Sequence, residues 1–121
     1  MKFLPDAISG PTITSYGPGW VAVNGERFEG PLIVHSESGA RAWNCPGYEL
    51  LGAQHFTPFL DLKPELIVFG SGDRIRFPRP EWLAQLYAQR IGVETMDTHA
   101  ACRTYNFLVG EGRRVVAALL V

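Results

Sequence analysis

The sequence predicts an α/β fold: a single compact three-layer domain with a mixed central β-sheet, helices packed on that sheet and an N-terminal β-hairpin. Residues 66–69 are four consecutive apolar residues bounded by Gly70, a pattern typical of a strand buried on both faces. Residues 80–90 and 98–109 carry apolar side chains at helical spacing, and strand-like runs follow them at 93–96 and 115–120. Strands that alternate with helices along a chain pack in layers, which favours the α/β class.

The hairpin and its neighbouring strands are expected near the start of the chain. Residues 20–23 and 26–28 flank Asn24 and Gly25, which supply the two positive-φ positions of a type I′ turn. Further strands are expected at 13–16, 31–35 and 42–44, with residues 36–39 as the loop between the last two. An early hairpin favours a mixed sheet over a purely parallel one.

Three helices are expected in the rest of the chain. Thr57 followed by Pro58 predicts a short helix, with threonine as N-cap and proline at the first helical position. The second helix begins at Pro80, and Gly92 stands where a glycine commonly ends a helix. The buried faces are expected to be Trp82, Leu83, Leu86, Tyr87 and Ile91 in this helix, and Ala101, Cys102, Tyr105, Leu108 and Val109 in the third, at residues 98–109.

Length and composition limit the protein class. We expect residues 1–121 to form one domain, because 121 residues is a typical single-domain length, and 46% hydrophobic and 19% charged residues are typical of a globular protein. A net charge of -1 argues against nucleic-acid binding. The longest apolar run, residues 115–121, is too short to insert into a membrane, and residues 1–11 resemble neither a secretory signal nor a transit peptide. We therefore expect a cytoplasmic protein.

The two cysteines, Cys45 and Cys102, indicate reduced thiols rather than a metal site or a disulfide framework. They lie far apart, and neither belongs to a CxxC pair, whereas a structural zinc site needs four closely spaced ligands. His99 stands three residues before Cys102 on the expected helix and could activate its thiol. However, Cys102 falls on the inner face, where thiols are usually inert. No catalytic residue, metal or cofactor is predicted.

A glycine-rich loop follows the strand at 66–69. It consists of Gly70, Ser71, Gly72 and Asp73. A dinucleotide-binding fingerprint would need a third glycine at position 75, which is isoleucine, and the prolines at 78 and 80 delay the next helix. The loop is therefore interpreted as a tight structural turn, and amides that hold an anion are the alternative.

The segment after this loop alternates arginine with apolar residues. If it is extended, Arg74 and Arg76 share one face, while Ile75 and Phe77 pack on the other. One interpretation is a solvated strand edge that charge keeps from aggregating. The other is a strip that faces a protein partner, because arginine is enriched at interfaces.

Polar residues also mark the beginning and the outer edge of the helix at 98–109. Asp97 and Thr98 are expected to be an N-cap pair, or to serve a ligand at the carboxyl end of the sheet. Arg103 and Asn106 share the polar edge of the helix. Asparagine is unfavourable inside a helix, so its side chain is expected to bond a loop or a partner.

Several segments of the chain resemble a family of uncharacterised domains that includes the mitochondrial complex I assembly factor 3 and the adipogenesis-associated domain protein. The segments are MDTHAACRTYN, EGRRVVAAL, PELIVFGSGDRIRFP and YGPGWVAVNGERFEGPLIV. The resemblance implies a three-layer α/β fold with no assigned catalytic residues, and mitochondrial relatives that bind other assembly factors and subunits. Gly70, Ser71 and Gly72 stand where the family usually has Gly-Thr-Gly. Without a transit peptide, the chain looks like a bacterial, cytoplasmic member.

Two functions follow from these observations. The first is a non-enzymatic protein-interaction or assembly-factor-like domain with protein partners of unknown identity, without nucleic-acid binding or membrane insertion. The alternative is a small-molecule or anion-binding site, which could be hydrolytic, at the carboxyl edge of strands 66–69 and 93–96. The expected binding surface consists of Gly70, Ser71, Gly72, Asp73, Arg74, Arg76, Asp97, Thr98, Arg103 and Asn106.

Overall fold

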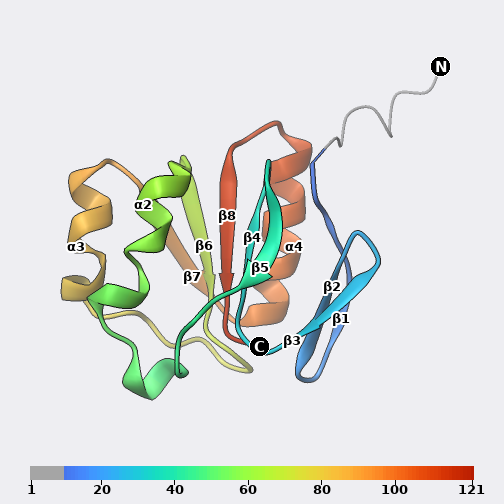
Figure 1. The fold of residues 1–121 in the computed structure, drawn as a ribbon, viewed down its shortest axis with the longest axis horizontal. Coiled ribbons are helices and arrows are strands. Elements are labelled where there is room, and N and C mark those ends of the chain that lie inside the picture. Colours follow the sequence, from blue (N-terminus) through green and yellow to red (C-terminus); the bar gives the residue numbers. More distant parts are fainter. Residues whose placement is uncertain (1–9) are drawn as a thin grey trace.

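The computed structural model describes residues 10–121, so the expectations for residues 1–9 lie outside the described part (Figure 1). Its strands are β1 (Ile13–Gly17), β2 (Trp20–Val23), β3 (Glu26–Glu29), β4 (Leu32–His35), β5 (Gly39–Ala42), β6 (Leu66–Gly70), β7 (Gly92–Met96) and β8 (Val115–Leu119). Its helices are the 3₁₀ turns η1 (Tyr48–Leu50) and η2 (Ala53–His55), and α2 (Pro58–Leu62), α3 (Pro80–Ala88) and α4 (Thr98–Gly110). None of the helices in residues 10–121 has the length and apolar character needed to cross a membrane.

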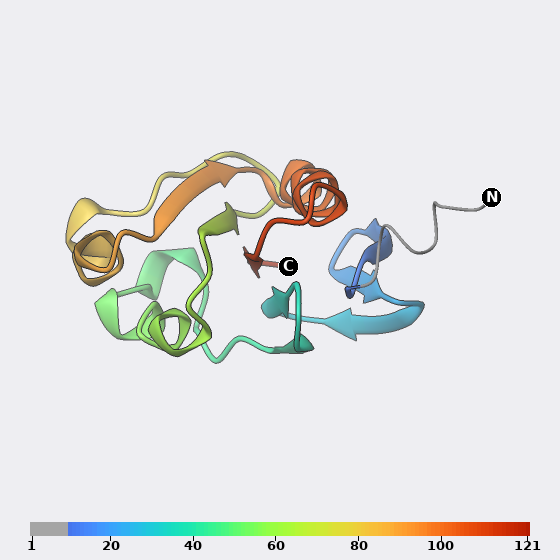
Figure 2. The same cartoon turned by 90° about the horizontal axis from the view of Figure 1, so that it is seen from above.

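The central sheet is mixed, as the sequence predicts. Its five strands follow the order β5-β4-β8-β6-β7. Strand β6 runs parallel to β7 and β8, whereas β4 is antiparallel to β8 and β5. Helices α2 and α3 lie on one face of the sheet and α4 lies on the other (Figure 2). The α/β class and the layered arrangement are therefore confirmed.

The two faces of the sheet bury two separate clusters, because strand side chains alternate. Toward α2 and α3, Ile67, Phe69 and Val116 pack with an aromatic cluster that includes Trp43, Phe56 and Phe59. Toward α4, Val68, Val115 and Ala117 pack with Ala101, Cys102 and Tyr105. All five residues of β8 are buried, as expected of a strand covered on both sides.

The hairpin is confirmed, but it belongs to a separate sheet. Asn24 has φ 49° and Gly25 has φ 86°, as a type I′ turn requires, and Val23 pairs with Glu26. Strand β1 pairs with β2, which makes a three-stranded antiparallel sheet beside α4. The antiparallel pairs of the central sheet are β5–β4 and β4–β8, so its mixed character does not depend on the hairpin.

Several local expectations were wrong. Helix α3 ends before Gly92, which begins β7, and Arg90 takes the left-handed position with φ 62°. The amide of Ile91 donates to the carbonyl of Leu86 at 3.0 Å, a bond typical of a Schellman end. Tyr87 is 52% exposed, because it lies beyond the apolar stripe of Trp82, Leu83 and Leu86.

Two smaller differences concern residues 42–57. Strand β5 spans Gly39–Ala42 rather than residues 42–44, because the turn after His35 is shorter than expected and pairs His35 with Gly39. Thr57 precedes α2, but its hydroxyl donates to the carbonyl of Ala53 at 3.4 Å and makes no capping bond.

Candidate functional site

Asp97 and Thr98 begin α4 at the carboxyl end of β7, but their side chains have different roles. Oδ1 of Asp97 accepts from the amide of Ala100 at 2.9 Å, which confirms the cap. Thr98 is buried instead of capping the helix. Its hydroxyl donates to the carbonyl of Leu120 at 2.7 Å and accepts from the amide of Gly72 at 2.8 Å. Thr98 therefore joins the glycine-rich loop to the end of β8.

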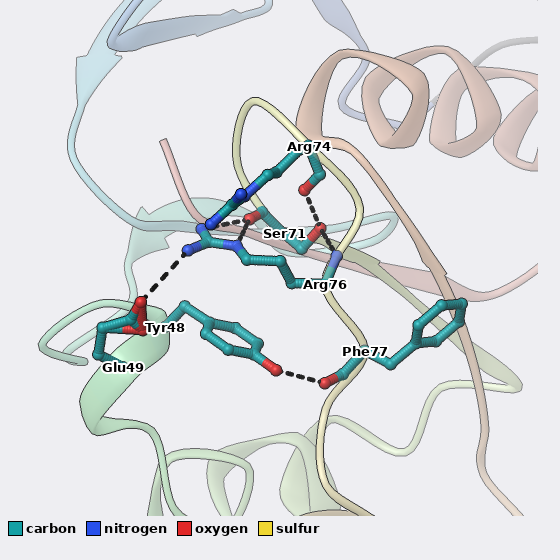
Figure 3. Close-up of polar contacts among 6 residues, drawn as sticks. All are labelled: Tyr48, Glu49, Ser71, Arg74, Arg76 and Phe77. Carbon is teal, nitrogen blue, oxygen red and sulfur yellow. Dashed lines mark hydrogen bonds and ion pairs between the residues drawn. The ribbon is translucent and has the colours of Figure 1, made fainter.

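Residues 70–73 form the tight turn that the sequence predicts. A Cβ atom on Gly70 would lie 2.9 Å from the Cα of Thr98, so this position needs glycine where β6 meets α4. Gly72 has φ 106°, which also favours glycine. The hydroxyl of Ser71 donates to the carbonyl of Arg74 at 2.7 Å and accepts from the amide of Arg76 at 2.8 Å (Figure 3). The side chain of Ser71 is thus engaged within its own loop.

Arg76 is anchored to the body of the protein. Its Nε and Nη2 donate to the carbonyl of Ser71 at 3.1 and 2.6 Å, and its guanidinium lies 4.6 Å from the ring centroid of Tyr48 (Figure 3). Nη1 lies 3.9 Å from a carboxylate oxygen of Glu49. The Tyr48 hydroxyl in turn donates to the carbonyl of Phe77 at 2.6 Å. These contacts fix the loop against η1.

The segment after the glycine-rich loop is not an extended strand, so Ile75 and Phe77 do not pack together on a buried face. No strand is present at residues 71–79, and Ile75 and Phe77 are 51% and 66% exposed. The contacts of Ser71 and Arg76 turn the backbone, so that the arginine packs inward and the apolar side chains face solvent. Asp73, Arg74 and Arg79 are exposed as well.

The outer edge of α4 is occupied by β1. Oδ1 of Asn106 accepts from the amide of Ile13 at 2.8 Å, and its Nδ2 donates to the carbonyl of Ile13 at 2.7 Å. Arg103 donates to the hydroxyl of Tyr16 at 2.9 Å, and the ring of His99 lies 4.5 Å from that of Tyr16. Arg103 and Asn106 therefore hold the small sheet in place. Proline and glycine punctuation at residues 17–19 indicates the turn of that sheet, but no local signal indicates its docking on α4.

The thiol of Cys102 is not suited to nucleophilic catalysis. Its side chain is fully buried, and this burial raises the pKa of the thiol to about 12. The Arg103 guanidinium opposes this rise in pKa and the carboxylate of Asp97 contributes to it. At neutral pH the group is a thiol, which is a poor nucleophile.

This burial predicts a difference in thiol labelling. In the folded protein, a thiol-specific reagent at pH 8 is expected to modify the partly exposed Cys45 first. Cys102 is expected to react only when the protein unfolds, and peptide mapping by mass spectrometry checks the order. Fast labelling of Cys102 in the folded state would contradict its assignment as an inert core residue.

A pocket of about 600 Å³ lies at the carboxyl ends of β6 and β7. It brings together Gly72, Asp73, Arg76, Asp97 and Thr98 from the predicted surface, and adds residues 17–20, Tyr48 and His99, which were not part of that surface. Gly70, Ser71, Arg74, Arg103 and Asn106 do not line it. Within residues 10–121, no three His, Cys, Asp or Glu residues converge where a metal ion could bind.

Comparison with known proteins places the chain in a family. Residues 13–120 match the family model described as "Protein of unknown function (DUF498/DUF598)". The chain belongs to this family. The DUF498/DUF598 match covers both sheets and α4. It includes every residue that lines the pocket except Val121.

Curated relatives of this DUF498/DUF598 domain confirm the resemblance seen in the sequence. The chain is 38% identical over 110 residues to the NADH dehydrogenase (ubiquinone) 1 alpha subcomplex assembly factor 3 of Bos taurus, with 89% of this chain and 59% of the relative covered. It is 36% identical over 108 residues to an uncharacterized protein of Rhodobacter capsulatus, with 89% and 82% covered. The chain thus spans about three fifths of the length of the assembly factor.

Solved structures agree with the DUF498/DUF598 fold. A crystal structure of a Bordetella parapertussis protein has a TM-score of 0.86 at 39% identity, covering 93% of this chain and 96% of that one. A solution structure from Bordetella pertussis, described as a Mth938-like domain, has a TM-score of 0.81 at 33% identity, covering 94% and 86%. The chain therefore shares its fold with bacterial proteins of similar length.

Proposed function

We propose that the chain is a non-enzymatic, assembly-factor-like domain that binds a protein partner through residues 74–79, here named the arginine-apolar strip. The observation that supports this proposal is the exposure of Ile75 and Phe77, 51% and 66%, between the exposed Arg74 and Arg79. Exposed apolar side chains with a polar rim are typical of protein-binding surfaces, and arginine is enriched there. Relatives named as assembly factors support the same function.

The strip is anchored to the body of the protein at two points. Ser71 and Arg76 fix its beginning, and the Tyr48 hydroxyl holds the carbonyl of Phe77. A surface that is already ordered loses less conformational entropy on binding, which raises affinity. Asp73 remains exposed beside the strip and Arg74 within it, whereas the side chains of Ser71, Thr98 and Asn106 are engaged within the chain. The proposed contact surface is therefore smaller than the one predicted from sequence.

Removing the two exposed apolar side chains tests this function. The double variant Ile75→Ser/Phe77→Ser is expected to fold normally and to weaken partner binding at least about ten-fold, or about 1.4 kcal/mol. Tagged protein isolated gently from its native host, with quantitative mass spectrometry of what remains bound, gives the measurement. Tyr87→Ser is the matched control, because Tyr87 is 52% exposed on α3, outside the strip. An unchanged set of bound proteins in the double variant would contradict the proposal.

The small-molecule alternative has one supporting observation, the pocket at the carboxyl ends of β6 and β7. Ligands of open α/β sheets bind at that edge, and about 600 Å³ is within the usual range for ligand pockets. Asp73 and Asp97 border it, and the guanidinium of Arg76, which also lines it, already donates to the carbonyl of Ser71, so an anion is disfavoured. A thermal-shift screen with nucleotides, phosphates and organic acids tests this alternative. A ligand at a hundredfold excess over its Kd stabilises by about 2.7 kcal/mol, so unchanged melting temperatures would remove it.

The setting of this function is also a proposal. Bacterial relatives of similar length, in Rhodobacter and Bordetella, support a bacterial setting, and we propose that the domain is cytoplasmic. Fractionation of host cells checks the location, and recovery of the protein outside the cytoplasmic fraction would contradict it.

A further inference from the structure

One edge of the central sheet is formed by β7, which pairs with β6 and with no other strand of residues 10–121. The carbonyl of Met96 accepts from the amide of Ser71 at 2.9 Å, so the backbone polar groups of Met96 point toward the β6 side. Because this direction alternates along a strand, Gly92 and Glu94 also point toward β6. The amides and carbonyls of Val93 and Thr95 therefore point outward.

These outward groups are unpaired within the described chain. No hydrogen bond in residues 10–121 reaches the backbone of Val93 or Thr95, and both residues are partly exposed. Sheet edges are commonly protected by proline, a bulge or charge. Strand β7 has neither proline nor a bulge, and Glu94 is its single charged residue. The edge can therefore pair with an added strand.

Glu94 disfavours a second copy of this chain as that strand. Two β7 strands can pair antiparallel with Glu94 of one copy opposite Glu94 of the other. In this register the amides and carbonyls of Val93 and Thr95 in both copies are all hydrogen-bonded. The two Glu94 Cα atoms would then be about 4.5 Å apart, and like charges directly opposite each other are destabilising. Glu94 is exposed and has no ion-pair partner among residues 10–121. It favours a basic residue across the edge.

We propose that the β7 edge accepts an extended strand of a protein partner that carries lysine or arginine opposite Glu94. The backbone of Val93 and Thr95 supplies affinity, and Glu94 selects the register. This inference rests on the proposed function, since it names a second contact for the same protein partner. Ser71 leads into the arginine-apolar strip and bonds Met96 at the end of β7, so the strip and the edge adjoin. One partner can contact both.

A charge-reversed copy of the protein serves as the probe strand. Wild-type protein mixed with Glu94→Lys protein is expected to form a heterodimer, because lysine then lies opposite Glu94. The Kd of the mixture should be at least about ten-fold lower than that of either protein alone. Sedimentation at millimolar concentration measures the association. Hydrogen exchange measured by NMR should slow at the Val93 and Thr95 amides of both proteins, while the already bonded Glu94 amide changes little.

Controls separate strand addition from other contacts. Thr95→Pro in both proteins removes an outward amide and no bond within the sheet, so the variant is expected to fold and to lose association. If it fails to fold, Glu94→Gln mixed with wild type provides a second test, with expected affinity between those of the mixture and of wild type alone.

Three outcomes would overturn the inference: a mixture that stays monomeric at millimolar concentration, protection that maps away from β7, or a wild-type homodimer through this edge that is as tight as the mixture. The double variant Ile75→Ser/Phe77→Ser, carrying Glu94→Lys, should still associate with wild-type protein. If the strip variant loses its cellular partner while the mixture stays monomeric, the proposed function stands and the strand-accepting edge is wrong.

Discussion

Asn106→Ala is expected to lower the free energy of unfolding by about 2–3 kcal/mol, because it leaves one amide and one carbonyl of Ile13 without partners. The Asn106 side chain bonds both groups, at 2.8 and 2.7 Å, in a partly buried position between α4 and β1. Chemical denaturation monitored by circular dichroism gives the measurement. The loss should be accompanied by faster hydrogen exchange in β1 and β2, because these strands are held on α4.

Two controls distinguish a fold role from a partner role for Asn106. Phe107→Ala changes a side chain that is 65% exposed on the same helix, and should alter stability by no more than about 0.5 kcal/mol. Asn106→Asp keeps the acceptor for the Ile13 amide and loses the donor, so its stability should lie below that of wild type. An Asn106→Ala protein of unchanged stability that loses its partner would instead assign this residue to the contact surface.

Thr98→Val is expected to cost about 2–3 kcal/mol, although valine has nearly the same shape as threonine. Thr98 is 5% exposed, and its hydroxyl serves both the amide of Gly72 and the carbonyl of Leu120. Valine leaves both groups without that partner. Chemical denaturation again gives the measurement.

Thr98→Ser is the matched variant, because it keeps the hydroxyl and removes one methyl group. Its expected cost is about 1 kcal/mol, from lost apolar burial. If valine were tolerated better than serine, the hydroxyl would not be holding the loop, and Thr98 would again be a candidate for ligand binding.

The sequence predicted those features that depend on neighbouring residues. Asn24 and Gly25 gave the hairpin, the apolar run at 66–69 gave β6, and Asp97 gave the cap of α4. In each case the signal and the structure lie within a few residues of each other.

The candidate site was harder to predict, because most of its contacts join distant segments. Asn106 and Ile13 are 93 residues apart, and no local pattern pairs them. Arg76 was assigned to the outer surface, since nothing in its own segment indicates the ring of Tyr48 or the carboxylate of Glu49. The left-handed conformation of Arg90 was missed for a different reason. Gly92 is the residue type that usually ends a helix in this conformation, but here it is Arg90 that has the positive φ.

The central position of β8 bears on how this protein folds as it is synthesised. Strands β4 and β6 lie on either side of β8, yet β8 leaves the ribosome after every other described strand. Until residues 115–119 emerge, the antiparallel and parallel halves of the sheet have no common neighbour, and both expose unpaired backbone. A chaperone that shields such nascent strands would act on this protein before β8 appears, and stable structure would form late in translation.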